Sequence, residues 1–242
     1  MTTGCGKSQW MIRTDPSKPS EASSVRTYPE VIEESPNVKS VSRVTDNKDR
    51  LLELGPPTLS PQEDILLYCI YELEEDVATV SNIWRQDVEG FSRTRLTFGR
   101  SLNLFPTLTH DGNDMVFSPN RAGSTFALCR VSLRKAAEIT KITNSSDSDY
   151  APSISPDGAK IAYMSIASGV DAERHIWTIN MAGNLPTHLR EGETPQISHD
   201  GKRILFVRTD KQSYRDQLWT MDLNGGDETQ LTENVTYDVT EP

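Results

Sequence analysis

The sequence is poor in three features that often define a protein class: cysteine, basic charge and long apolar runs. It has 3 cysteines in 242 residues, too few for a disulfide framework, and no C-x-x-C pair that would indicate zinc. Lys and Arg number 25 against 35 Asp and Glu, a net charge of −10. Nucleic-acid-binding proteins need a basic face, so this balance argues against that class. Because no run of about 18 apolar residues occurs, we expect no transmembrane segment.

Motifs for catalysis and for metal binding are also lacking. The four histidines form no His-x-x-x-His or Glu-x-x-His pattern, and no G-x-S-x-G nucleophile elbow is found. His110 and His199 precede an Asp in a repeated turn described below, so we expect them to be exposed turn residues. Cys69 and Cys129 lie in strand-like segments and are interpreted as small buried hydrophobes. The sequence therefore predicts no enzyme activity, no cofactor and no metal site.

The first 39 residues differ in composition from the rest of the chain. Their charges balance, so the whole net charge of −10 belongs to residues 40–242. Residues 11–39 are rich in Ser, Pro, Glu and Lys, which predicts that 1–39 is a disordered tail or linker. Thr3-Gly4-Cys5 resembles the end of a bacterial lipoprotein cleavage box, although the charged and apolar parts of a signal peptide are absent. Two interpretations stay open: Cys5 is lipidated and 6–39 is a tether, or Cys5 is an ordinary cysteine.

An internal repeat organises the remaining chain. Four similar segments begin at prolines spaced 49, 46 and 43 residues apart, namely Pro57, Pro106, Pro152 and Pro195. A hydroxyl residue stands three positions after each proline, an aliphatic residue or Met nine after, and an aromatic residue eleven after. Three copies place Asp-Gly between these positions, where the freedom of Gly to take a positive φ favours a hairpin turn. We interpret the repeated Asp as a turn residue and the repeated aromatic as packing between units.

The second half of each repeat also has strand-like patterning. Trp84, Trp177 and Trp219 occupy one equivalent position in a third strand, and we predict that the second copy replaces this Trp with Ala127. Four short antiparallel strands in a period of roughly 40–50 residues are typical of a β-propeller blade. The sequence thus predicts an all-β propeller with four full blades and partial strands at each end. The predicted blades are 57–97, 106–143, 152–190 and 195–232.

Particular motifs of the repeat carry a family resemblance. The segment from Pro152 to Tyr163 reads Pro-x-x-Ser-Pro-Asp-Gly-x-x-Ile-Ala-Tyr, which resembles the WD40-like PD40 β-propeller repeat of the TolB family. The later part of the unit, represented by 217–226 and 230–232, agrees with that repeat. The resemblance covers residues 40–242 and is weakest in the first blade, which has Gln62-Glu63 where other copies have Asp-Gly.

The resemblance implies a function as well as a fold. It implies a non-enzymatic protein-interaction scaffold of the bacterial cell envelope, either in Tol-Pal-type envelope integrity or in surface binding. It would be periplasmic or associated with the outer membrane or cell surface, with other envelope proteins or peptides as partners, no nucleic acid, and a lipid anchor if Cys5 is modified. The alternative is the N-terminal propeller of a prolyl-oligopeptidase-like or dipeptidyl-peptidase-like serine peptidase. A G-x-S-x-G motif in the natural reading frame beyond Pro242 would identify the alternative.

The loops between the second and third strands vary most from copy to copy, and binding residues often lie on such loops. The partner-binding candidates on these loops are Glu74, Glu75, Arg121, Asp171, Arg174, Lys211, Tyr214 and Arg215.

The repeat also extends beyond the four full copies. Residues 42–45 match a fourth strand, and residues 237–242 match the lead-in to another blade. We therefore expect an incomplete ring and hypothesise that the chain is a fragment of a longer natural protein.

Overall fold

The computed structural model describes residues 52–54, 57–74, 77–89, 92–120, 125–134, 138–169 and 172–233, with the backbone alone for 52–54, 72–74 and 77–79. All regular structure in these ranges is β-strand, arranged as four antiparallel sheets. The predicted tail, Cys5 and the predicted partial strands at 42–45 and 237–242 lie outside the described residues. No helix that could cross a membrane occurs in the ranges described.

Each sheet is one blade with its strands hydrogen-bonded in chain order, except that β1 and β2 of blade 1 both pair with β3. Blade 1 contains β1 (Leu52–Leu54), β2 (Thr58–Leu59), β3 (Ile65–Glu74), β4 (Val77–Asp87) and β5 (Arg93–Arg95). Blade 2 contains β6 (Asn103–Leu108), β7 (Asp114–Pro119), β8 (Cys129–Ser132) and β9 (Thr140–Lys141). Blade 3 contains β10 (Ser148–Ile154), β11 (Lys160–Ile166), β12 (Arg174–Asn180) and β13 (Thr187–Glu191). Blade 4 contains β14 (Glu193–Ile197), β15 (Arg203–Thr209), β16 (Asp216–Asp222) and β17 (Thr229–Gln230).

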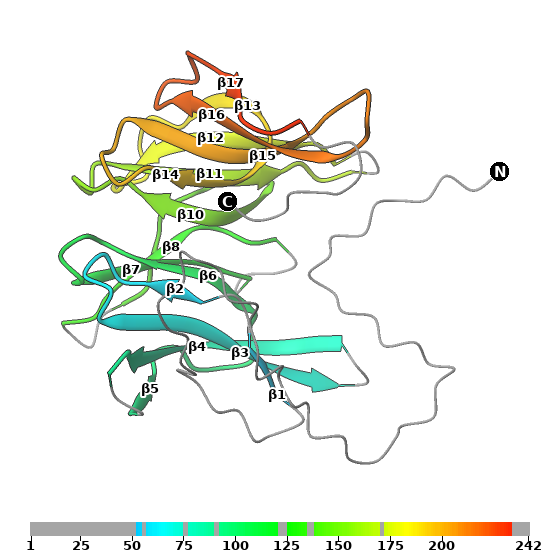
Figure 1. Cartoon of the computed structure of the whole chain (residues 1–242). Coiled ribbons are helices and arrows are strands. Elements are labelled where there is room, and N and C mark those ends of the chain that lie inside the picture. Colours follow the sequence, from blue (N-terminus) through cyan, green and yellow to red (C-terminus); the bar gives the residue numbers. More distant parts are fainter. Residues whose placement is uncertain are drawn as a thin grey trace, which may run out of the picture.

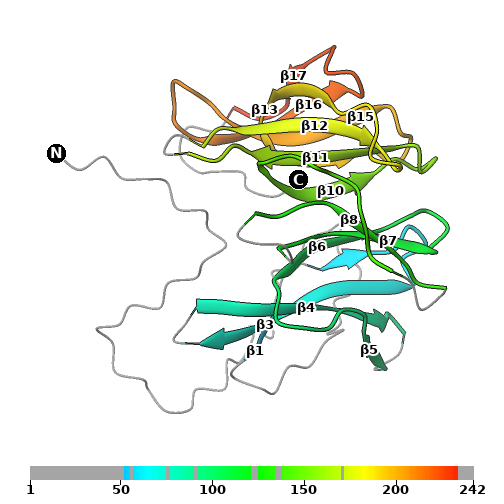
Figure 2. The same ribbon diagram turned by 180° about the vertical axis from the view of Figure 1, so that it is seen from behind.

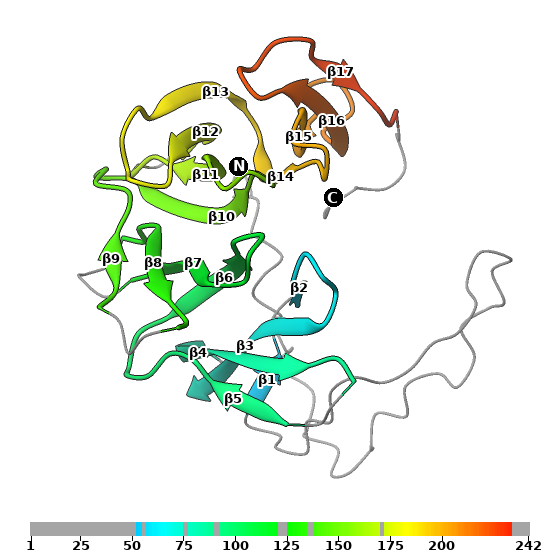
Figure 3. The same ribbon diagram turned by 90° about the vertical axis from the view of Figure 1, so that its left-hand side faces the viewer.

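The four blades follow one another around an arc in sequence order. Figure 3 shows the first strands β2, β6, β10 and β14 on the inner side of this arc and the last strands β5, β9, β13 and β17 on its outer side. Figures 1 and 2 show the blades from the side, stacked face against face. The predicted all-β fold, a propeller of four-stranded antiparallel blades, is confirmed.

A bulge precedes the repeated proline in three of the four blades. Phe105, Ala151 and Thr194 have φ values of 50°, 48° and 48°, and the strand registers shift at the same points. In blade 1 the equivalent residue is Pro56, whose ring cannot adopt a positive φ. The first strand of that blade is split into β1 and β2, which both pair with β3.

The repeated hydroxyl residue closes the turn between the first two strands. In blade 3 the Ser155 hydroxyl donates to the carboxylate of Asp157 and accepts from the amide of Lys160 at 2.9 Å. This donated hydrogen bond lowers the pKa of Asp157, and Gly158 takes a φ of 70°. The same contacts recur in blades 2 and 4. The predicted turn role of Asp-Gly is thus confirmed, and in blade 1 Glu63 takes the glycine position with a φ of 58°.

Packing between blades uses alternate side chains of the second strand. Ile161 and Tyr163, nine and eleven residues after the blade 3 proline, pack against Val116 of blade 2 in one buried cluster. Val116 is ten residues after its own proline, so it points to the opposite face of its strand. Corresponding clusters join blade 1 to blade 2 and blade 3 to blade 4. The prediction that the repeated aromatics pack between blades is confirmed for blades 2, 3 and 4.

The strand registers correct one prediction about the third strand. Trp84, Trp177 and Trp219 lie opposite the aromatic residues of their second strands, but in blade 2 the residue opposite Phe117 is Cys129. The prediction that Ala127 replaces the Trp is therefore wrong, because the residue opposite Phe117 lies two positions further along the chain. Cys69 and Cys129 are buried as predicted, and burial raises the pKa of the Cys69 thiol to about 12.

One aliphatic residue near the fourth strand of each blade is buried where another blade follows. Ile142 and Leu189 are 6% and 3% exposed and belong to the clusters joining their blades to the next. Leu231, the equivalent residue of blade 4, is 54% exposed. Among the described residues no blade follows blade 4, so its outer apolar face lacks the cover that the other blades receive.

A buried carboxylate lies at the junction of blades 2 and 3. Asp149 is fully buried and accepts hydrogen bonds from the hydroxyls of Ser165 at 2.7 Å and Ser145 at 2.9 Å. Burial raises the pKa of Asp149, although hydrogen bonds from three hydroxyl groups oppose the change. In blade 2 the same position, three residues before the proline, holds the neutral Asn103.

Leu189→Ala and Leu231→Ala should differ sharply in stability. Truncating the buried Leu189 leaves a cavity and should lower the free energy of unfolding by about 2–4 kcal/mol. The same change at the half-exposed Leu231 should cost less than about 1 kcal/mol. Urea denaturation of both variants measures the difference, and equal losses would contradict the proposed role of the following blade.

Asp149→Asn should make the protein more stable at neutral pH. Because the folded pKa of Asp149 lies above its unfolded value, this group makes the free energy of unfolding fall as pH rises from about 4 through the folded pKa. The variant should match the wild type below about pH 4 and exceed it at pH 7. Denaturation across this pH range provides the measurement, with the exposed Asp87→Asn as control. Destabilisation of Asp149→Asn at pH 7 would show that the ionised carboxylate is required.

Candidate functional site

The strand order of each blade separates its loops into two ends. Turns after the first and third strands lie at one end, whereas loops after the second strand and connections between blades lie at the other. We call the second of these the loop end. Figure 1 shows the loop that follows β15 on the right-hand side of the molecule, the side on which β3 ends and β4 begins. Loops at one end of a rigid scaffold are the usual place for binding residues.

Four of the eight predicted binding residues are described in full, and all four lie at the loop end of blades 3 and 4. They are Arg174, Lys211, Tyr214 and Arg215. The side chain of Glu74 and the whole of Glu75, Arg121 and Asp171 lie outside the described residues, so their placement stays a prediction.

A repeated backbone contact holds successive blades together at the loop end. The amide of Gly192 in the connection to blade 4 donates to the carbonyl of Arg174 in blade 3 at 2.9 Å. The amide of Asp149 donates in the same way to the carbonyl of Phe126 in blade 2 at 3.1 Å. Because these bonds join backbone groups, the side chains at each junction are free to differ.

At the junction of blades 1 and 2 the side chains are small and polar. The Asn103 amide group donates to the carbonyl of Ser81 at 2.7 Å, and the Ser81 hydroxyl donates to the carbonyl of Asn103 at 2.9 Å. Both residues are buried. This junction is a buried hydrogen-bond network in which Asn103 Oδ1 has no partner, and neither of these two side chains is exposed.

The junction of blades 2 and 3 carries an aromatic cluster instead. The rings of Phe126 and Tyr150 lie 4.8 Å apart between centroids, and Phe105 meets Tyr150 edge-on at 6.1 Å. All three side chains are half-buried. Aromatic clusters that stay partly exposed are favoured contact points for other proteins. The repeat spacing does not predict this cluster, because its members come from three segments and only two of them adjoin recognised repeat positions.

The junction of blades 3 and 4 carries an ion pair. A guanidinium nitrogen of Arg174 lies 3.4 Å from a carboxylate oxygen of Glu193. Burial nevertheless raises the pKa of Glu193, and the nearby carboxylate of Asp216 raises it further, while Arg174 opposes both. This junction thus has charged side chains where the preceding junction has aromatic ones.

Exposed residues of blade 4 extend this charged area. Lys211 forms an ion pair with Glu191 of blade 3 at 3.1 Å. Tyr214 is 81% exposed and has a φ of 53°. Its backbone N–H closes the turn by donating a hydrogen bond to the carbonyl of Asp210 at 2.9 Å. The fold therefore presents a large aromatic side chain to solvent at the tip of the loop.

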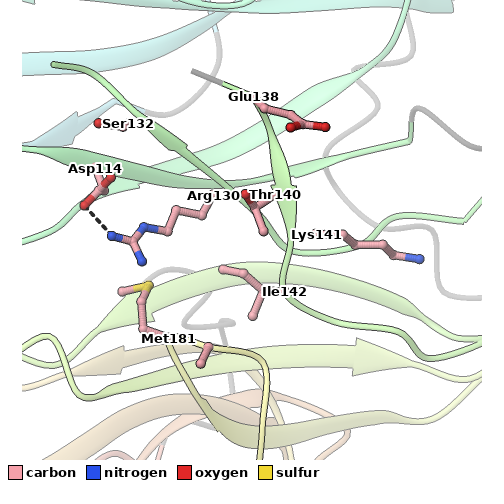
Figure 4. Close-up of a pocket in the computed structure, with 9 residues that line it drawn as sticks. Asp114, Arg130, Ser132, Glu138, Thr140, Lys141, Ile142 and Met181 are labelled. Atoms are coloured by element: carbon pink, nitrogen blue, oxygen red, sulfur yellow. Dashed lines mark hydrogen bonds and ion pairs between the residues drawn. The ribbon is translucent and has the colours of Figure 1, made fainter. Parts of the chain in front are cut away.

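The opposite end of the blades contains a separate pocket of about 360 Å³. Figure 4 shows it between blade 2 and the blade 3 turn that contains Met181. Of its two cationic side chains, Arg130 and Lys141, Arg130 is already paired with Asp114 at 2.7 Å, which raises the pKa of Arg130. The predicted turn histidines His110 and His199 also lie at this end and are exposed, as expected. The described ranges contain no group of three or more side chains placed to hold a metal ion.

Comparisons with known proteins agree with this architecture. The sequence matches the family described as "TolB beta propeller domain" over residues 42–242. An uncharacterized protein of Agrobacterium fabrum is 29% identical over 141 residues, which are 53% of this chain and 47% of that protein. The chain thus spans about half the length of this curated relative.

Solved structures share the fold at low sequence identity. TolB from Acinetobacter baumannii has a TM-score of 0.62 at 21% identity, covering 75% of this chain and 44% of that one. A putative TolB from Agrobacterium tumefaciens has a TM-score of 0.58 at 17% identity, covering 75% and 81%. An acylaminoacyl peptidase from Pyrococcus horikoshii has a TM-score of 0.53 at 12% identity, covering 75% and 32%. These likenesses concern the fold alone. Because the family match runs through all four blades, the chain belongs to the TolB β-propeller domain family.

Proposed function

We propose that the chain is a non-enzymatic protein-binding module of the bacterial cell envelope and that it binds through the loop end of blades 2, 3 and 4. One observation carries the proposal. The backbone contact between blades repeats at successive junctions, whereas the side chains there change from aromatic to ionic. Packing of the blades explains why the backbone contact is constant, and recognition of a partner explains why the side chains vary.

The chemistry of this surface favours a protein or peptide partner. The aromatic cluster of Phe105, Phe126 and Tyr150 supplies partly exposed rings, and the Arg174–Glu193 pair lies at the next junction. Interfaces between proteins combine such aromatic anchors with a charged rim. The net charge of −10 would also steer a basic partner toward the module.

The envelope location rests on family membership and on similarity to proteins named TolB. A lipid anchor at Cys5 would hold the module at a membrane surface, with residues 6–39 as its tether. Intact-mass analysis of the protein from its native host distinguishes a lipidated Cys5 from an unmodified one.

Position-specific photo-crosslinking tests the binding surface. A photoreactive phenylalanine analogue replaces Tyr214, which is 81% exposed at the loop end, or Leu185, which is 79% exposed in a turn at the opposite end. In envelope preparations we expect a discrete protein adduct from the Tyr214 position and none from the Leu185 position.

The adduct should also depend on the aromatic cluster. Tyr150→Ala should reduce the yield at the Tyr214 position by at least about tenfold, as expected when a central interface aromatic is removed. A circular dichroism melt identifies any loss due to unfolding. Adducts of equal yield from both ends, or none at the loop end, would contradict the proposal.

A further inference from the structure

Blade 3 departs from the repeat on its outer strands. In blades 1 and 4 a threonine of the fourth strand donates to an amide side chain of the third, as Thr97 does to Asn82 at 3.3 Å. Blade 3 has His175 and Arg190 at these two positions. The pairing of β12 with β13 also shifts register between Ile176 and Trp177. The threonine–amide hydrogen bond of blades 1 and 4 is therefore replaced in blade 3 by an imidazole and a guanidinium group.

A chain of three side chains occupies this place. Nε2 of His188 lies 3.0 Å from Nδ1 of His175, and Nε2 of His175 lies 3.1 Å from a carboxylate oxygen of Glu173. Since the carboxylate accepts, His175 carries its proton on Nε2 and presents a lone pair at Nδ1. His188 then donates a hydrogen bond from its own Nε2 to Nδ1 of His175. The edge of Trp177 packs against the His188 ring at 5.1 Å between centroids.

We propose that His175 and His188 form a binding site for a late first-row transition metal ion, with Cu²⁺ bound most tightly. Imidazole suits these metals, and affinity for a given site rises along the series to Cu²⁺. Two nitrogens about 2.0 Å from one ion are about 2.8 Å apart at right angles and about 3.3 Å apart in a tetrahedron. The observed separation of 3.0 Å lies between these values.

Loading the site requires one proton to move within His188. Its proton transfers from Nε2 to Nδ1, so the ring stays neutral and offers the Nε2 lone pair to the metal. Glu173 keeps its hydrogen bond from Nε2 of His175, which is the carboxylate–histidine–metal arrangement that orients ligating histidines. Glu173 is thus a positioning residue, and water completes the coordination.

The pair of rings is open to solvent. His188 is exposed and His175 is half-buried, so an ion can reach both rings. The charge of Arg190 is partly offset by Glu228 at 3.4 Å. Glu191 stands opposite His175 in the strand register and adds a carboxylate to this edge.

Titration of the full chain with copper(II) sulfate tests the site, in a Cys5→Ser background that removes the thiol of the tail. Isothermal titration calorimetry should show one Cu²⁺ per chain, and electron paramagnetic resonance should show coupling to two imidazole nitrogens. His188→Gln should weaken binding at least about tenfold, and Glu173→Gln should weaken it by a smaller factor. His199→Gln, at an exposed turn histidine of the opposite end, is the matched control and should leave the affinity unchanged.

Two results would overturn the site. One is wild-type affinity in His188→Gln, and the other is a spectrum without two imidazole nitrogens. Neither result bears on the proposed protein-binding surface, because that surface is tested by crosslinking at Tyr214 without metal.

Discussion

The structure depends on one packing interaction, in which the aromatic and aliphatic residues of one blade's second strand pack against the preceding blade. A single blade is a thin sheet with two faces and cannot bury both alone. Tyr163 and Phe206 are buried because an adjacent blade covers them. The same constraint explains why Leu231 is exposed while Leu189 is not. The stability of this fold therefore comes more from packing at the junctions between blades than from the individual blades.

The residues that build the fold and the residues available for recognition lie at different ends of the blades. Hydroxyl, Asp and Gly residues that build the turns recur at one end of the blades because each has a geometric task there. At the loop end the junctions after blades 2 and 3 carry backbone hydrogen bonds, which place no demand on side-chain identity. Phe126 and Arg174 occupy equivalent positions with unrelated chemistry for this reason. Variation at a structurally constant position is the physical basis for placing a binding surface there.

Much of the fold could be predicted from spacing, because the prolines, turn residues and aromatics repeat with the blade. The position of Cys129 opposite Phe117 could not be predicted, since this loop differs in length in every blade and only blade 2 has no Trp to mark the third strand. The site was less predictable. Loop position indicated Arg174, Lys211 and Tyr214, but the cluster around Tyr150 arises only when three segments meet. The pairing of His175 with His188 likewise depends on a strand register that no sequence spacing reveals.

The central claim is that backbone hydrogen bonds hold the junctions after blades 2 and 3 while the side chains there remain available for recognition. Native-state hydrogen exchange on a Phe126→Ser variant tests it most directly, because the Asp149 amide donates to the carbonyl of residue 126. The account predicts that the amides of Asp149 and Gly192 stay as protected as in the wild type. Loss of protection at Asp149 alone would show that the aromatic ring holds the junction, and would contradict the account.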